Sequence, residues 1–221
     1  MKEYTVEFIG TLFLILGAIM YGAVGASVIL MAMIYAGGHI SGAHYNPAVT
    51  LAMMIRGKAT LKETVPYWIA QFAGAIVAAL IGCYLFGKEG TSDCAITSDG
   101  IVKALSAEII GTFALVYVVL NVATTTGTKG NSFYGIAIAG TVLAMAYAVG
   151  NFSGGAFNPA AGVGLSIQKT FCWEQIWVYF VGPFAGAALA AVLFNYINVD
   201  DKPTPPIPDA GDDSSPHNSK R

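Results

Sequence analysis

Long apolar stretches that hold at most one charged residue constrain this chain more than any other feature. Six of them approach the roughly 20 residues that a helix needs to cross a bilayer; they span 6–21, 23–38, 68–86, 104–122, 133–149 and 176–199. Only 11% of all residues are charged, against about 25% in a typical soluble domain. The runs are continuously apolar, without the alternation of a transmembrane β-barrel. The sequence therefore predicts an all-α membrane protein.

The first two stretches adjoin at a glycine-rich centre, Gly22 and Gly25, and can be read as two spans or as one long hydrophobic segment. The opening residues, MKEYTVEF, carry one lysine and no small-residue cleavage site follows them, which indicates a retained span rather than a signal peptide. Arg56, Lys58 and Lys62 lie between the second and third spans. The positive-inside bias then predicts cytoplasmic termini, and we expect a multi-pass protein of the plasma membrane.

The chain repeats itself. EFIGTLFLIL from Glu7 matches EIIGTFALVY from Glu108 at an offset of 101, whereas SGAHYNPA and SGGAFNPA match at an offset of 112, so the second half holds about 11 extra residues, most simply at 124–133. Each half contains three spans, an odd number, so the second half enters from the opposite side. We predict two inverted repeats, at 1–100 and 101–199.

The end of the chain and its cysteines carry weaker signals. Residues 200–221 are rich in proline, aspartate and serine, which predicts a disordered cytoplasmic tail. Cys94 and Cys172 would share the outer side of the membrane, where a disulfide is chemically possible. Cys83 is the third cysteine, and spacing alone does not fix which of the three pair.

Each half places Asn-Pro-Ala before about ten mostly apolar residues, as Asn46-Pro47-Ala48 and Asn158-Pro159-Ala160. Asparagine is a strong N-cap, and proline suits the first helical position because its missing N–H costs nothing there. Ten residues rise about 15 Å, half of a hydrocarbon core of about 30 Å. We predict half-helices at 46–55 and 158–167 that enter from opposite faces and meet at the midplane.

This arrangement suits a pore for neutral solutes. Each half-helix N-terminus carries roughly half a positive charge, which repels cations, while the Asn46 and Asn158 amides can donate hydrogen bonds. The segments leading in, GGHISGAHY and GNFSGGAF, are not expected to form regular helix. Their carbonyls must face water, because exposure to lipid costs several kcal/mol per group. The expected pore-lining backbone comprises Gly42, Ala43, His44, Gly154 and Ala156.

Four further polar residues lie in or next to the predicted spans, namely Glu7, His39, His44 and Glu108. Glu7 and Glu108 begin equivalent spans, where a carboxylate either snorkels to the surface or accepts hydrogen bonds; we favour bonds from the re-entrant loop of the same half. His39 and His44 have no third ligand beside them, so we expect no metal site. No nucleophile–base pair occurs in the spans, and the glycine–alanine patterns indicate helix packing. We expect no enzyme activity, no cofactor and no nucleic-acid partner.

At these motifs the chain resembles the aquaporin, or major intrinsic protein, family. The likeness covers about residues 4–198 through EFIGT, GHISGAHYNPAVT, SGGAFNPA and YFVGPFAGA. It implies an aquaporin-like right-handed bundle of six transmembrane helices with two re-entrant half-helices. It also implies a homotetramer with one pore in each protomer and passive conduction of water or small neutral solutes across the lipid bilayer.

The resemblance also assigns a selectivity constriction, at Ala26, Ala146, Gly155 and Ala161. The family usually has arginine directly after the second Asn-Pro-Ala, where this chain has Ala161. Four small residues predict a wide, weakly polar constriction that passes glycerol, urea or solutes of similar size, and the helix termini are then the main barrier to ions.

Three alternatives stay open at this stage. In a water-selective channel, Tyr21, Phe152 or another aromatic would rebuild a narrow constriction; Tyr179 and Phe180 resemble the aromatic pair of water-selective members. A structural or adhesive membrane protein would keep the fold and conduct poorly. An ion-conducting channel would pass current in a planar bilayer.

Overall fold

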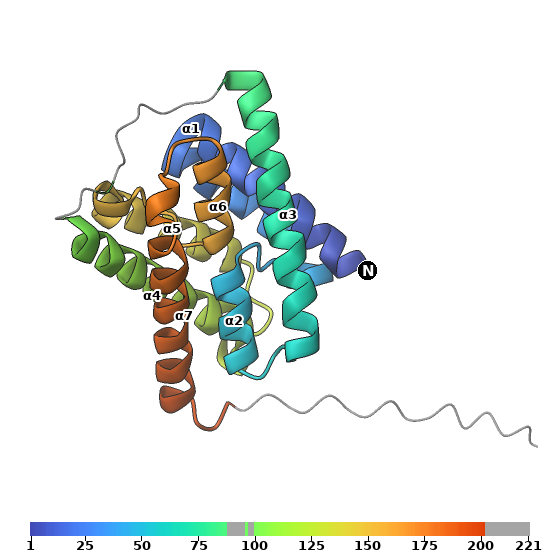
Figure 1. The fold of residues 1–221 in the computed structure, drawn as a ribbon. Coiled ribbons are helices and arrows are strands. Elements are labelled where there is room, and N and C mark those ends of the chain that lie inside the picture. Colours follow the sequence, from blue (N-terminus) through green and yellow to red (C-terminus); the bar gives the residue numbers. More distant parts are fainter. Residues whose placement is uncertain (88–95, 97–99, 202–221) are drawn as a thin grey trace, which may run out of the picture.

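The computed structural model describes residues 1–87, 96 and 100–201, which form helices and short connections. The elements are α1 (Lys2–Ser41), α2 (Pro47–Ile55), α3 (Leu61–Phe86), α4 (Ile101–Thr124), η2 (Thr126–Thr128), α5 (Tyr134–Ser153), α6 (Pro159–Ile167), η3 (Trp173–Gln175) and α7 (Val178–Ile197). In Figure 1 the short helices α2 and α6 lie one below the other, among the long helices. The predicted all-helical membrane fold is confirmed.

Within the described ranges, five helices are long and apolar enough to cross a bilayer, because α1 contains both of the first two predicted spans. The chain bends inside α1 at Tyr21 and at Gly22, whose φ is +56°. Its two arms then run side by side: a Cβ on Gly37 would lie 2.5 Å from the Val6 side chain. A glycine with positive φ permits this reversal without a loop.

The long helices approach one another at glycines. A Cβ on Gly74 of α3 would lie 2.4 Å from the Phe8 carbonyl of α1, and one on Gly186 of α7 would lie 2.4 Å from the Ile109 carbonyl of α4. Because neither glycine has a side chain, the backbones come close enough for dispersion contacts to bind the helices without help from the hydrophobic effect. Helix α1 therefore packs against α3, and α4 packs against α7. The short helices α2 and α6 lie among these long helices (Figure 1).

The segments that lead into α2 and α6 are shorter than the sequence suggested. Helix α1 continues through Ser41 and α5 through Ser153, so GGHIS and GNFS are helical and that expectation is corrected. The helices end at Gly42 and Gly154, whose φ angles are +82° and +89°. A left-handed glycine ends a helix while its N–H still bonds within the last turn. In these two segments, residues 42–45 and 154–157 are not helical.

The predicted Cys94–Cys172 disulfide and the predicted disordered tail involve residues that the structure does not describe. Cys94 and residues 202–221 lie outside the described residues, so the Cys94–Cys172 pairing and the disorder of the tail stay predictions. Asp201, at the start of the tail, is described, and its side chain lies 3.6 Å from the guanidinium of Arg56. Arg56 directly follows α2, so the last described residue is held near the end of the first half-helix.

Candidate functional site

The site begins with two asparagines that cap the half-helices. The Asn46 side-chain oxygen accepts a hydrogen bond from the Ala48 N–H at 2.9 Å, and the Asn158 oxygen accepts one from the Ala160 N–H at 2.9 Å. Both asparagines have extended backbones, and proline follows each of them at the first helical position. The Asn158 oxygen also accepts from the Ala161 N–H at 3.4 Å. The caps therefore satisfy one N–H group at the start of α2 and two at the start of α6, groups that a helix leaves unpaired.

The same two side chains join the halves of the molecule. The Asn46 amide nitrogen donates to the Phe157 carbonyl at 2.9 Å, and the Asn158 amide nitrogen donates to the Tyr45 carbonyl at 3.0 Å. Each acceptor is the residue that precedes the other asparagine. Since an amide nitrogen carries two hydrogens, each asparagine keeps one donor for a molecule in the space between the tips.

Tyr45 and Phe157 shape the turn before each cap. Their φ angles are +50° and +48°, and each residue is only 1% exposed. Their rings lie against helix glycines: a Cβ on Gly10 would be 2.1 Å from the Tyr45 ring, and one on Gly111 would be 2.1 Å from the Phe157 ring. Left-handed backbone is costly for bulky residues, so this packing holds the turn and directs the neighbouring carbonyls.

A buried carboxylate supports the first turn. Glu7 is fully buried and accepts hydrogen bonds from the Ser41 hydroxyl at 2.7 Å, the His44 N–H at 2.9 Å and the Tyr45 N–H at 2.7 Å. The Gln71 amide donates to the same carboxylate at 2.8 Å. The carboxylate therefore satisfies the His44 and Tyr45 N–H groups, which regular structure leaves unpaired.

The second half repeats this support with three donors. Glu108 is also fully buried, and it accepts from the Ser153 hydroxyl at 2.7 Å, the Ala156 N–H at 2.9 Å and the Phe157 N–H at 2.7 Å. Neither carboxylate snorkels to the surface. Hydrogen bonds to a charged acceptor are shorter and stronger than neutral ones, so both loops are held firmly.

Sequence reasoning missed several supports from α3. Besides Gln71, the Trp68 indole donates to the Pro47 carbonyl at 3.0 Å, and the Tyr67 hydroxyl donates to the Ser41 carbonyl at 2.8 Å. The available signal was Gln71, an amide within an otherwise apolar span. A polar side chain in a membrane helix usually faces a partner.

A cavity of about 1570 Å³ runs past these groups. Eleven of the predicted site residues line it: Ala26, Gly42, Ala43, His44, Asn46, Ala146, Gly154, Gly155, Ala156, Asn158 and Ala161. The remaining motif residues are buried and do not line the cavity, namely Pro47, Ala48, Pro159 and Ala160. The motif therefore presents only its asparagine side chains to the cavity.

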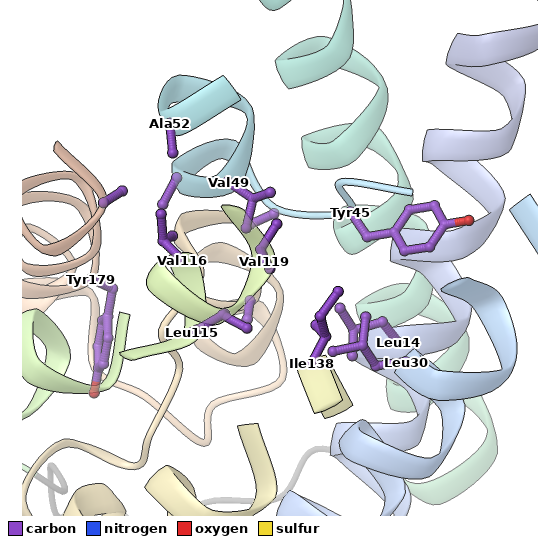
Figure 2. Close-up of a cluster of buried hydrophobic side chains, with 14 of the residues drawn as sticks. Leu14, Leu30, Tyr45, Val49, Ala52, Leu115, Val116, Val119, Ile138 and Tyr179 are labelled. Carbon is purple, nitrogen blue, oxygen red and sulfur yellow. The ribbon is translucent and has the colours of Figure 1, made fainter. Parts of the chain in front are cut away.

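The opposite wall of the cavity is apolar. Figure 2 shows Leu14 and Leu30 of α1 close to Ile138 of α5, with Leu115 and Val119 of α4 nearby. All five residues line the cavity. A solute between the two walls finds carbonyls and amides on one side and side chains that cannot hydrogen-bond on the other.

The constriction residues predicted from the sequence come together in part. A Cβ on Gly155 would lie 3.5 Å from the Ala146 Cα and 3.2 Å from the Gly150 Cα, so α5 and the second loop touch there. Ala26 and Ala161 line the same cavity. None of the four offers a polar side chain, and none is larger than alanine.

The aromatic residues considered from the sequence are placed differently. Tyr21 lines the cavity but is 71% exposed. Among the described residues that line the cavity, Phe152, Tyr179 and Phe180 are absent. Phe171, which sequence reasoning missed, is present and is only 4% exposed. No motif or spacing pointed to it.

His39 and His44, the two histidines in the described part of the chain, are not placed to bind a metal ion. Among the described residues, no group of three His, Cys, Asp or Glu side chains is placed to hold an ion. The His44 Nδ1 lies 3.2 Å from the Thr50 hydroxyl, and its ring lies 5.0 Å from the ring of Tyr67. His44 and His39 both line the cavity, where they are available to a passing solute.

Long apolar helices around a lined cavity, with two half-helices meeting inside it, define a multi-pass membrane channel. The comparisons with known proteins agree: the family model of the major intrinsic proteins matches residues 1–194. The chain belongs to that family. It is an integral membrane channel for water and small solutes, and it is not an enzyme.

Relatives support the assignment. The chain is 35% identical over 210 residues to aquaporin NIP1-4 of Oryza sativa subsp. japonica, covering 87% of this chain and 76% of the relative. It is 36% identical over 183 residues to aquaporin TIP1-2 of Zea mays, covering 81% and 71%. The solved aquaglyceroporin of Plasmodium falciparum has a TM-score of 0.66 at 19% identity, covering 89% of this chain and 96% of that one, and shares the fold.

Proposed function

We propose that this channel conducts small neutral solutes such as glycerol or urea, as well as water, through a wide constriction that lacks arginine. One observation carries the proposal: Ala26, Ala146, Gly155 and Ala161 all line the cavity. An aromatic and cationic ring at these positions would leave room for little more than one water molecule. Four residues no larger than alanine leave a broader opening and add no charge to it.

Solutes would pass by exchanging hydration for fixed polar groups. The irregular segments 43–45 and 155–157 offer main-chain groups, and Asn46 and Asn158 each offer one amide hydrogen at the midpoint. The apolar wall at Leu14, Leu30 and Ile138 keeps the polar groups of the solute turned to the other side. No covalent step is required, and the direction of flux follows the concentration gradient.

Cations would be excluded by the half-helices. Both N-termini point to the middle of the cavity, where each contributes roughly half a positive charge. The half-helix tips are surrounded by buried side chains, a medium of lower dielectric constant than water, so this field is screened less than it would be in bulk water. A channel without the filter arginine depends on this barrier more heavily than one that has it.

The test uses proteoliposomes in a stopped-flow instrument, challenged with water, glycerol and urea gradients. Ala161→Arg is compared with Ala161→Met, which adds a long side chain without charge. We expect the arginine variant to reduce glycerol and urea flux more than water flux. The methionine variant should reduce glycerol and urea flux less than the arginine variant does. Unchanged glycerol flux in Ala161→Arg would show that the constriction lies elsewhere.

A water-selective channel is the second candidate, favoured by the aromatic side chains of Tyr21 and Phe171 in the cavity lining. It predicts normal water flux with no glycerol flux from the wild-type protein. A poorly conducting structural protein predicts that liposomes shrink no faster than empty ones. A current in a planar bilayer would instead mark an ion channel.

We also propose a homotetramer in the plasma membrane with both termini in the cytoplasm. The connection between α2 and α3 holds Arg56 and Lys58, and Lys62 lies in the first turn of α3. The positive-inside bias favours the cytoplasm for this connection. Light scattering of the detergent-solubilised protein tests the tetramer, and labelling of a cysteine placed at Lys58 in intact cells tests the orientation.

A further inference from the structure

We propose that Phe171 sets the width of the channel on the α6 side, and is therefore a specificity-determining residue. The inference rests on the proposed function, because it concerns which neutral solutes pass. It also adds a residue that neither the Asn-Pro-Ala motifs nor the four constriction positions include. Phe171 lies in the connection between α6 and α7, where it lines the cavity although only 4% of the residue is exposed.

The backbone of Phe171 is held by the end of α6. Lys169 has a left-handed φ of +68°, which turns the chain back over the last turn of the half-helix. The N–H groups of Thr170 and Phe171 then donate to the Leu165 carbonyl at 2.9 and 3.2 Å. Both bonds go to one carbonyl group in the last turn of α6, which the helix end would otherwise leave unpaired. The ring therefore projects from a fixed point.

One face of the Phe171 ring packs against α7. The rings of Phe171 and Tyr179 are stacked, with centroids 4.4 Å apart and planes inclined by 10°. Tyr179 is 1% exposed, and its hydroxyl donates to the Ser153 carbonyl at 2.6 Å. Because stacking adds to the burial of both rings, Phe171 cannot swing away from the cavity without leaving a void behind it.

The ring also touches the loop that forms the constriction. A Cβ on Gly154 would lie 2.3 Å from the Phe171 Cε1, so only glycine leaves room for the ring. The next residue is Gly155, which lies against Ala146 and Gly150. Phe171 therefore occupies the space beside the constriction that the side chain of residue 154 would otherwise take.

The two ends of the cavity differ at this point. Gly42 is the repeat equivalent of Gly154, and a Cβ on it would lie 3.3 Å from the His44 Nε2. A ring thus lies over the helix-ending glycine in both halves. On the α2 side it is an imidazole that can hydrogen-bond, and on the α6 side it is a phenyl ring that cannot. Ala156, the repeat equivalent of His44, supplies no ring there.

A ring with this placement makes the constriction narrower than its four small residues alone would be. It offers no hydrogen bond, so a wider solute gains nothing from the contact and must displace the ring. Removing the ring would admit longer polyols while leaving the polar groups of the half-helix tips unchanged. A residue with only a packing role would change stability without changing the ratio of solute to water permeability.

The experiment compares Phe171→Ala and Phe171→Leu with Phe152→Ala, a matched control whose aromatic side chain is 42% exposed and is absent from the described cavity lining. Stopped-flow proteoliposomes are challenged with water, glycerol and the four-carbon polyol erythritol. We expect the erythritol-to-water permeability ratio to rise about tenfold in Phe171→Ala, equivalent to about 1.4 kcal/mol in the barrier. The leucine variant should show a smaller rise, and the control none.

An unchanged ratio in Phe171→Ala protein that elutes as the wild type does in gel filtration would overturn the inference. If the alanine variant does not fold, Phe171→Leu decides in the same way. If the wild type passes water but neither glycerol nor urea, the wide constriction is refuted instead. The inference on Phe171 then stands only if Phe171→Ala gains glycerol flux.

Discussion

The side-chain amide of Asn46 donates a 2.9 Å hydrogen bond to the main-chain carbonyl of Phe157, a residue of the other half of the chain. A matching bond runs from Asn158 to the Tyr45 carbonyl at 3.0 Å. The two half-helices therefore do more than approach each other. Each asparagine caps its own helix with its oxygen and fastens the opposite loop with its nitrogen.

Asn46→Asp should disrupt this junction. A carboxylate still caps α2 but cannot donate to the Phe157 carbonyl, which then loses its buried donor at a cost of about 1–3 kcal/mol. The added negative charge also offsets the positive ends of the half-helices. We expect a lower thermal unfolding midpoint in detergent and a measurable cation current in a planar bilayer.

The control for that change is Asn198→Asp, at the end of α7. The Asn198 amide likewise donates to a main-chain carbonyl, that of Phe194, at 3.0 Å. It does not take part in the junction of the tips, so cation exclusion should persist. Equal currents from both variants would contradict the role given to the Asn46–Phe157 bond.

Glu7→Gln and Glu108→Gln should each destabilise the loop that the carboxylate supports. Glutamine has one accepting oxygen in place of two, and its amide nitrogen would face N–H donors. Losing hydrogen bonds to a charged acceptor costs about 1.5–3 kcal/mol each. The thermal unfolding midpoint in detergent measures the loss of stability. Glu174→Gln is the matched control, because Glu174 is exposed. Equal midpoints for all three variants would rule out this support.

Gly10→Ala and Gly111→Ala should destabilise the protein through the rings of Tyr45 and Phe157. An added Cβ would lie 2.1 Å from each ring, and overpacking of this kind costs about 1–3 kcal/mol. Gly140→Ala in α5 is the control, because a Cβ there meets nothing within 4 Å. Thermal unfolding should show the first two variants below the wild type and the control at or above it.

Asp201→Asn should weaken the connection between the start of the tail and the half-helix α2. Asp201 lies 3.6 Å from the Arg56 guanidinium and accepts from the Thr126 N–H at 3.1 Å. The Arg56 side chain is only 3% exposed and lies 4.9 Å from the centre of the Phe194 ring. A buried cation that loses its anionic partner is destabilised.

We expect Asp201→Asn to lower the free energy of unfolding by only about 1–3 kcal/mol, because the Asp201 main-chain carbonyl still accepts a hydrogen bond from Arg56. The exposed neighbour Asp200 provides the comparison, as Asp200→Asn. Differential scanning of both variants in the same detergent measures the difference. Identical curves would show that the ion pair adds nothing to stability.

The sequence alone predicted much of this molecule. Apolar length gave the membrane helices, because a span needs about 20 residues without charge. Asn-Pro-Ala gave both half-helices nearly to the residue, since the N-cap asparagine and the first-turn proline are local signals. The end of α1 was misjudged because Gly37 and Gly38 suggested irregular chain. Gly37 instead stays helical, where the missing Cβ leaves room for the Tyr45 hydroxyl.

Other features depend on residues far apart in the chain. The hydrogen bond from Asn46 to Phe157 joins positions 111 apart, and Phe171 lines the cavity because Tyr179 and Gly154 hold its ring. Local sequence determines where a helix starts and whether a segment can cross a bilayer, because those choices depend on neighbouring backbone groups. Only the tertiary structure decided which side chains border the cavity, because close packing between distant helices determines which groups meet.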